Sequence, residues 1–523
     1  MSETVENSPK KSSKGLIIGI IIAIIVIAGG VAAYTMVKTS SPKAQYFLAE
    51  KASFDGARDF FEERYSLEKD WYEFQQENAV GVDMDISGNY TDPGAYGFSE
   101  IEEIVNNINL VLETETDMKA KEMVTHISAN AMGMKIEDFS VALTENDLFI
   151  VLPFLDEVLK INDEDVGDLL KEIDPYTFDD DDTEYDFGQF FDQQKLFTED
   201  EQKYLEDEYA KFVFDELPED SFTSESEKVK VLGDEVKTEK ITMKLNEDQI
   251  KEIADKVLSK MKEDDKLKEI VADKLEVVVG AGNAVMVSDM MDDFDDAIEE
   301  VQELFEDGVF KEGITSTIWV DKDTIVKRDF AFNAGEGSNE GTLKMKGDQK
   351  VSKEEVAFAY EFGFEDEYDD VVFNLDGSLT WKDDQAEDEV TFTFADDYDE
   401  FNIVYRGEES VEKSKKDFER EFGVESDFFN FAINWDGSGT YDKDSMTSEN
   451  TFSTDLSDFY AGQIELNVDV DGEKIKSVEM PDTSKEKDIG KMSESELMKY
   501  VEEVIEPNFE KWMMGYFMEM SAF

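Results

Sequence analysis

The pattern of apolar and polar positions divides the chain into segments of different type. An uncharged apolar stretch at residues 15–37 is followed by residues 44–79, where aromatic side chains recur mostly at helical spacing and predict one long amphipathic helix. Between residues 82 and 152, period-two stretches predict the strands of a meander with one buried face. Apolar residues at i, i+3 and i+4 then predict two further helices, at residues 247–262 and 288–310.

The C-terminal part of the chain, residues 313–492, reads almost wholly as short strands and hairpins. Residues 372–384 match residues 432–444 at a fixed offset of 60, which indicates tandem β units. Each copy contains an Asp-Gly pair between alternating segments, and this pair predicts a tight hairpin turn. The chain ends in an amphipathic helix predicted within residues 493–523.

These segments predict an α+β fold, with large twisted antiparallel sheets, open or curved into a half-barrel, packed against amphipathic helices and preceded by one N-terminal transmembrane helix. The predicted parts are a cytoplasmic tail at 1–14, a transmembrane anchor at 15–37, a helical stalk at 38–80, a first α+β lobe at 81–312 with an acidic insertion at 174–227, a β-rich lobe at 313–492 with its repeat at 372–384 and 432–444, and a C-terminal helix at 493–523.

The predicted anchor rests on length and charge. Residues 15–37 contain no charged side chain, and about 20 apolar residues are needed to span a bilayer. Lys10, Lys11 and Lys14 precede the stretch and two lysines follow it, so the positive-inside rule favours a cytoplasmic N-terminus. The alternative is a cleaved secretory signal. Both readings predict an extracytoplasmic body, and the first predicts a single-pass protein of the cell membrane.

Charge narrows the range of partners. The sequence has 51 Lys and Arg against 129 Asp and Glu, a net charge of −78. Such a chain repels polyanions, so nucleic acid is excluded as a partner. Because 12% of the residues are aromatic, we expect a folded body with a hydrated acidic surface rather than disorder. There is no cysteine, which excludes disulfides, thiolate metal sites and a cysteine nucleophile.

Candidate chemistry is sparse. His126, the only histidine, lies in an alternating strand and is interpreted as structural. Residues 467–472 resemble the start of a calcium loop, but position 12 is Val478 instead of Glu. A glycine pair beginning at Gly280 lacks the third glycine of a dinucleotide fingerprint, where Val285 stands. We therefore predict no catalytic residue, no cofactor-binding residue and no metal ligand.

Residues 41–51 (SPKAQYFLAEK), directly after the apolar stretch, resemble an uncharacterised firmicute family of single-pass membrane proteins with a domain of unknown function. The order of a strand at 241–245, capped helices and the strands at 316–327 is also similar to extracytoplasmic lipoproteins of the lipid-carrier type. That second resemblance implies a curved sheet that cups helices around an apolar cavity, although this chain lacks the lipidated cysteine of those proteins.

The sequence thus predicts a non-enzymatic, membrane-anchored binding or interaction protein of the cell envelope. One alternative is a carrier or sensor of an apolar ligand, such as a lipid, held between the sheet and the helices at 247–262 and 288–310. Another is a carboxylate-dependent hydrolase of cell-wall glycans. The predicted partners are the membrane and either an apolar ligand or an envelope protein.

Overall fold

The computed structural model describes most of the chain after residue 40. The described residues are 41–91, 102–103, 105–131, 134–173, 185–192, 198–279, 287, 290–291, 293–335, 341–365, 370–395, 400–426, 428–457 and 462–520. They form two compact units. Unit 1 comprises Met1–Phe60, Lys195–Ser378 and Phe392–Tyr398, and unit 2 comprises Phe61–Gln194, Leu379–Thr391 and Asp399–Phe523.

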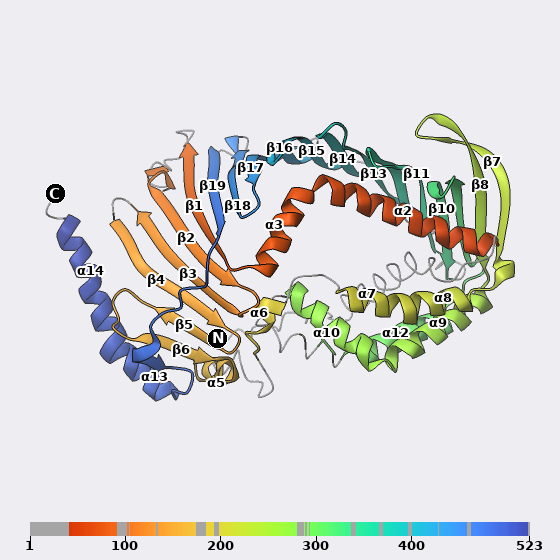
Figure 1. Ribbon diagram of the computed structural model, residues 1–523. Helices are drawn as coiled ribbons and strands as arrows, with labels where there is room; N and C mark the ends of the chain where they lie inside the picture. Colours follow the sequence, from red (N-terminus) through yellow and green to blue (C-terminus); the bar gives the residue numbers. More distant parts are fainter. Residues whose placement is uncertain are drawn as a thin grey trace, which may run out of the picture. The chain divides into compact units, whose positions relative to one another are not determined.

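The strands of unit 1 follow one another as an antiparallel meander, with neighbours paired from β7 to β12. They are β7 (Phe222–Val231), β8 (Asp234–Leu245), β9 (Ile314–Asp321), β10 (Thr324–Ala334), β11 (Gly341–Val351), β12 (Glu355–Glu365) and most of β13 (Asp370–Thr380). The helices are the first part of α2 (Pro42–Arg64), then α7 (Glu199–Leu205), η1 (Glu206–Ala210), α8 (Lys211–Glu216), α9 (Glu247–Lys262), α10 (Asp265–Val279) and α12 (Phe294–Asp307), with a short η2 (Glu219–Ser221) (Figure 1).

Two apolar cores hold unit 1 together. In the first, Tyr46 and Phe47 of α2 pack with Phe222, Ile241 and Ile318 of the sheet. The second joins the helices to one another, and its buried members include Met261 of α9 and Phe294 and Ile298 of α12. The apolar stripes predicted within residues 247–262 and 288–310 therefore contribute buried side chains to these cores, and the ligand cavity beside them stays a prediction.

Unit 2 is also mainly antiparallel, but its strands come from both ends of the chain. They are β1 (Val80–Thr91), β2 (Ile108–Asp117), β3 (Glu122–Ala131), β4 (Met134–Thr144), β5 (Asp147–Val151), β6 (Val158–Asn162), the first part of β14 (Gln385–Ala395), β15 (Glu400–Glu412), β16 (Lys415–Ser426), β17 (Asn430–Tyr441), β18 (Ser445–Asp455), β19 (Gln463–Lys474) and β20 (Glu486–Asp488). Its helices are α3 (Ser66–Glu77), α5 (Asp163–Ile173), α6 (Gln189–Asp192), η5 (Thr483–Lys485), α13 (Glu494–Tyr500), η6 (Val501–Ile505) and α14 (Glu506–Met520).

The connection that defines unit 2 is the antiparallel pairing of β1 with β19, which runs from Val80 opposite Lys474 to Thr91 opposite Gln463. This pairing corrects the fold class and the two contiguous lobes predicted at 81–312 and 313–492. Within unit 2, β1–β6 and β15–β20 therefore belong to one hydrogen-bonded sheet, although the prediction placed them in separate lobes. Period-two alternation shows that a segment is a strand but does not show which distant strand it pairs with.

The membrane predictions are also corrected. Among the described residues, no helix is both long enough and apolar enough to cross a bilayer. The longest, α2, has 23 residues but carries charged side chains such as Glu50, Lys51 and Arg64. The predicted tail at 1–14 and anchor at 15–37 lie outside the described residues. The single-pass topology, the extracytoplasmic location and the membrane as partner rested on that anchor and have no support in the described structure.

The predicted Asp-Gly hairpin turns are wrong in both repeats. Gly377 lies within β13 and Gly437 within β17, and the tight turns come later, at Lys382–Gln385 and Asp442–Ser445. The glycines have a packing role: a Cβ on Gly437 would lie 2.4 Å from the Phe418 ring, and one on Gly377 would lie 2.4 Å from the Phe358 ring. Both glycines are therefore needed to admit an aromatic ring against the backbone.

Candidate functional site

The sheet of unit 2 has two chemically different faces. Residues directly opposite each other on antiparallel strands share a face, and alternate residues along one strand point to opposite faces. The face that carries Tyr405, Phe422, Ile433, Phe452 and Leu466 is called the apolar face. The face that carries Glu408, Glu419, Asp436, Thr451 and Asn467 is called the polar face.

Helix α3 covers one end of the apolar face. Its Trp71 is 7% exposed and lies against Gly472 of β19, where a Cβ would come within 2.7 Å of the indole ring. Trp71 also stacks on Phe74, with the ring centroids 5.4 Å apart. The predicted single helix over 44–79 is broken at Tyr65, between α2 and α3.

A buried ion cluster fixes this helix break to the sheet. Arg64 donates to Asp388 (Nη1 to Oδ1, 3.0 Å) and lies 3.5 Å from Glu409, and all three side chains are 1% exposed. Glu409 also pairs with Lys416 at 2.9 Å and with Arg420 at 3.2 Å. Lys416 in turn pairs with Glu68 of α3. Three cations thus meet three carboxylates, which is the balance that a buried charge cluster requires.

The cluster also sets the electrostatics of the surrounding aromatic groups. Lys416 Nζ lies 4.4 Å from the centroid of the Tyr65 ring, a cation–π contact. Burial, together with the charge of Asp388, raises the pKa of Tyr405 to about 12. Burial lowers the pKa of Arg64, but hydrogen bonding to Asp388 and the charge of Glu409 outweigh that effect and raise it. Near neutral pH Tyr405 is therefore neutral and Arg64 is charged.

Beyond α3 the apolar face is open. Five large side chains from β15, β16, β17 and β19 are between 39% and 48% exposed. They are close in register, because Phe422 lies opposite Ile433 and Thr454 lies opposite both Ile433 and Ile464. The five residues, called the open apolar patch, are Ile403, Phe422, Ile433, Ile464 and Leu466.

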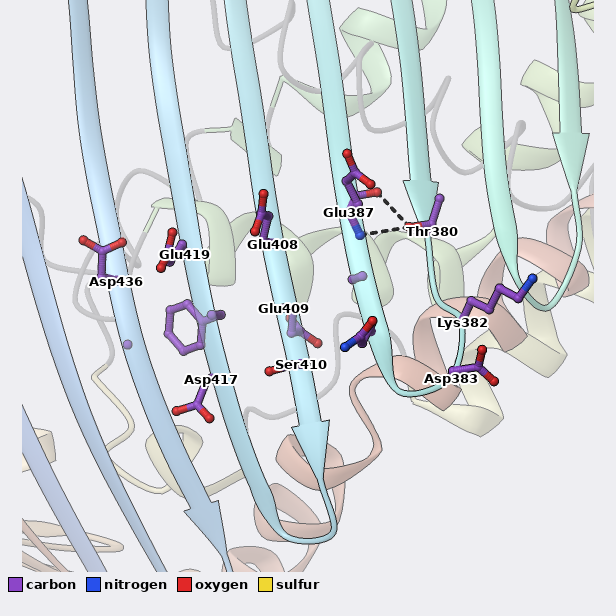
Figure 2. Close-up of a pocket in the computed structure, with 14 residues that line it drawn as sticks. Thr380, Lys382, Asp383, Glu387, Glu408, Glu409, Ser410, Asp417, Glu419 and Asp436 are labelled. Carbon is purple, nitrogen blue, oxygen red and sulfur yellow. Dashed lines mark hydrogen bonds between the residues drawn. The ribbon is translucent and has the colours of Figure 1, made fainter.

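The polar face carries a wide acidic hollow of about 780 Å³. Figure 2 shows Glu387, Glu408, Glu419 and Asp436 in this hollow, one from each of the neighbouring strands β14 to β17. Glu408 stands directly opposite Glu419, and Glu419 directly opposite Asp436. Carboxylates that stand directly opposite each other destabilise a sheet. Because they are clustered here, they also give this surface a strong negative potential.

The residues considered at the level of sequence do not meet in one place. His126 lies in β3, opposite Glu113 and Ser140. Residues 467–472 lie inside β19, so the calcium loop considered there does not form. Gly280 and Val285 lie outside the described residues. Within the part that the structure describes, no group of three or more His, Cys, Asp or Glu side chains could hold a metal ion.

Both the ion cluster and the open apolar patch were missed by sequence reasoning. Arg64 and Asp388 are 324 residues apart, and no local pattern links them. The sequence contains one signal for the ion cluster, which is composition: arginine is rare in this chain, so each arginine is a candidate for a specific contact.

Comparisons with known proteins assign no family. No protein-family model matches the chain, and no curated protein matches it. Solved structures that align include the outer membrane protein opdK of Pseudomonas aeruginosa, with 4% identity over 76% of this chain and 99% of that chain and a TM-score of 0.23. Salmonella typhi OmpF in complex with daunomycin aligns with 7% identity over 76% of this chain and 98% of that chain, at a TM-score of 0.16. Scores this low carry no argument about fold or function, and the firmicute resemblance stays a prediction.

Proposed function

We propose that this protein is a non-enzymatic binding protein that holds an uncharged long-chain amphiphile on the open apolar patch of unit 2. The observation that carries the proposal is the exposure of five large apolar side chains on one face of the sheet, next to the end that α3 covers. Contiguous exposed apolar surface on a folded protein marks a binding site. The proposal keeps the predicted binding role and moves the apolar ligand from the helices at 247–262 and 288–310 to the sheet.

The patch is large enough to matter energetically. Fully burying a large apolar side chain contributes about 1.5–3 kcal/mol, so covering the exposed part of each patch residue contributes roughly 1 kcal/mol. Five such residues together contribute about 5 kcal/mol to the binding free energy, before the cost of ordering the ligand is subtracted. A binding free energy of about 5 kcal/mol corresponds to a dissociation constant below about 1 mM.

Charge favours an uncharged ligand. The chain carries a net charge of −78, and the polar face of the same sheet has carboxylates in direct register. A fatty-acid carboxylate would be repelled by this field, whereas a long-chain alcohol of the same length would not.

Titration of the full chain with Nile red, an uncharged apolar dye, tests the proposal. We expect saturable binding that is displaced by a long-chain alcohol. The double variant Phe422→Ser/Ile433→Ser removes two patch residues, or about 2 kcal/mol, and should weaken binding roughly 30-fold. The matched control is Leu304→Ser in α12, which removes an apolar side chain that is more exposed than any patch residue. Equal weakening in both variants, or no saturable binding to the unmodified chain, would contradict the proposal.

Catalysis on glycans has no comparable support. A glycan hydrolase needs a carboxylic acid whose pKa is raised, next to a second carboxylate in a cleft. Burial raises the pKa of Asp163, Glu206 and Asp273. None of these three lines the acidic hollow of the polar face.

A further inference from the structure

A second feature of unit 2 is a straight row of polar side chains on the polar face, one from each of six adjacent strands. Each member stands directly opposite the next across β15, β16, β17, β18, β19 and β1. Because neighbouring strands are about 4.8 Å apart, the row is about 24 Å long. Its members, in order, are Arg406, Glu421, Asn434, Ser453, Glu465 and Asn89.

All six residues line a groove. One hollow of about 440 Å³ is lined by the Arg406 end of the row, and a second of about 310 Å³ by the Asn89 end. The two hollows share Asn434 and Asp455, so they adjoin at the middle of the row. Together they form an elongated depression that runs across the strands.

The middle and one end of the groove offer free hydrogen-bonding groups. Within the described residues, the side chains of Asn434, Ser453 and Asn89 have no hydrogen-bond partner. An amide or a hydroxyl group can both donate and accept, as the hydroxyl groups of a sugar do. Such a series of two-way groups matches a ligand that carries hydroxyl groups along its whole length.

The charged members of the groove are already held in place. Arg406 Nη1 donates to Glu421 at 2.6 Å, and Nη2 donates to Glu425 at 2.9 Å. Asp455 accepts from Gln463 at 3.0 Å, and Glu465 accepts from Asn467 at 3.1 Å. Each carboxylate keeps further lone pairs, so the groove presents rigid acceptors beside the free amides and hydroxyl.

We infer that this groove binds a linear, uncharged glycan that lies across the strands of unit 2. Four carboxylates, those of Glu421, Glu425, Asp455 and Glu465, stand against the single guanidinium of Arg406 among the groove's charged groups. The acidic hollow begins two residues further along β16 and β17, at Glu419 and Asp436. This field excludes polymers of acidic sugars. The row of polar side chains is on the opposite face from the open apolar patch, and of the patch residues Ile464 alone also lines a hollow of the groove. The inference does not depend on the proposed function.

Calorimetric titration of the full chain with cellohexaose tests this inference. We expect saturable binding, and Asn434→Ala and Ser453→Ala should each weaken it about three- to tenfold, the effect of one lost hydrogen bond. Ser438→Ala is the matched control, because Ser438 is on the polar face of β17 but outside both hollows. Asn89→Ala, on another strand, repeats the test if a first variant fails to fold.

Two further titrations examine the charge argument. Binding of cellohexaose should stay constant from about 0.01 M to about 1 M sodium chloride, although the Debye length falls from ~30 Å to ~3 Å. A hexamer of galacturonic acid should bind at least tenfold more weakly at low salt. The inference is overturned by an absence of cellohexaose binding, by equal weakening in Ser438→Ala, or by tighter binding of the acidic hexamer.

Discussion

Glu409 is the buried carboxylate that Arg64, Lys416 and Arg420 share, so its replacement by glutamine gives a sharp test of how α3 is held on the sheet. Its side chain is 1% exposed and contacts Arg64 at 3.5 Å, Lys416 at 2.9 Å and Arg420 at 3.2 Å. Glu409→Gln keeps the shape but removes the charge. The cluster would then contain three cations against two carboxylates, Asp388 and Glu68.

One positive charge of the cluster is then uncompensated, which costs about 3–5 kcal/mol at a buried site. The neighbouring Glu408→Gln is the matched control, since Glu408 lies on the same strand but on the polar face, opposite Glu419. Removing one member of a like-charge pair should stabilise the sheet by about 0.2–1 kcal/mol. The two substitutions, which are adjacent and chemically identical, should therefore change the stability of the sheet in opposite directions.

Hydrogen exchange read by mass spectrometry is the suitable assay, because it follows unit 2 separately in a chain of two units. In Glu409→Gln, peptides from α3 and β15–β17 should lose protection, equivalent to about 3–5 kcal/mol of opening free energy. In Glu408→Gln they should keep or gain protection. Equal effects in both variants would refute the view that the cluster holds α3 on the sheet.

Two further predictions concern other contacts. Gly437→Ala should destabilise unit 2 by about 1–3 kcal/mol, because the new Cβ would lie 2.4 Å from the Phe418 ring, whereas Gly363→Ala, whose nearest neighbour would be 3.8 Å away, should have little effect in urea unfolding. In unit 1, burial raises the pKa of Asp264, but hydrogen bonds from Tyr204 and Tyr209 and from the Leu267 N–H outweigh this and hold it below its usual range. The stability contributed by Asp264 is therefore present above its unfolded pKa of about 3.9 and lost as the pH falls through the folded value. The difference in thermal stability between Asp264→Asn and the unmodified chain should shrink toward acid, and a constant difference would contradict this assignment.

Local features of the structure could be predicted from sequence because their determinants are close together. The helix at 247–262 has the predicted bounds, and capping boxes at Asn246–Gln249, Thr198–Glu201 and Ser493–Glu496 begin α9, α7 and α13. In each case a side chain and a backbone N–H three residues apart satisfy each other, so a short stretch of sequence contains the whole signal.

Features that depend on distant residues could not be predicted. The partner of β1 is β19, and the Asp-Gly pairs lie within strands because an aromatic ring from a neighbouring strand occupies the place of a Cβ. The open apolar patch could not be found either, since the same alternation describes a covered and an uncovered face. How much of the apolar face is covered depends on how far α3 extends over the sheet.

The most direct test of the central claim is fluorescence quenching by a brominated long-chain alcohol. Trp435 is on the apolar face, opposite Phe452 and one residue pair from the patch, and its ring stacks on Phe452 at 5.3 Å. The chain has five tryptophans, so the measurement compares the unmodified protein with Trp435→Phe. If the alcohol's chain lies on the open apolar patch, quenching is saturable and most of it is lost in Trp435→Phe. Quenching that is unchanged in Trp435→Phe, or that never saturates, would contradict the account.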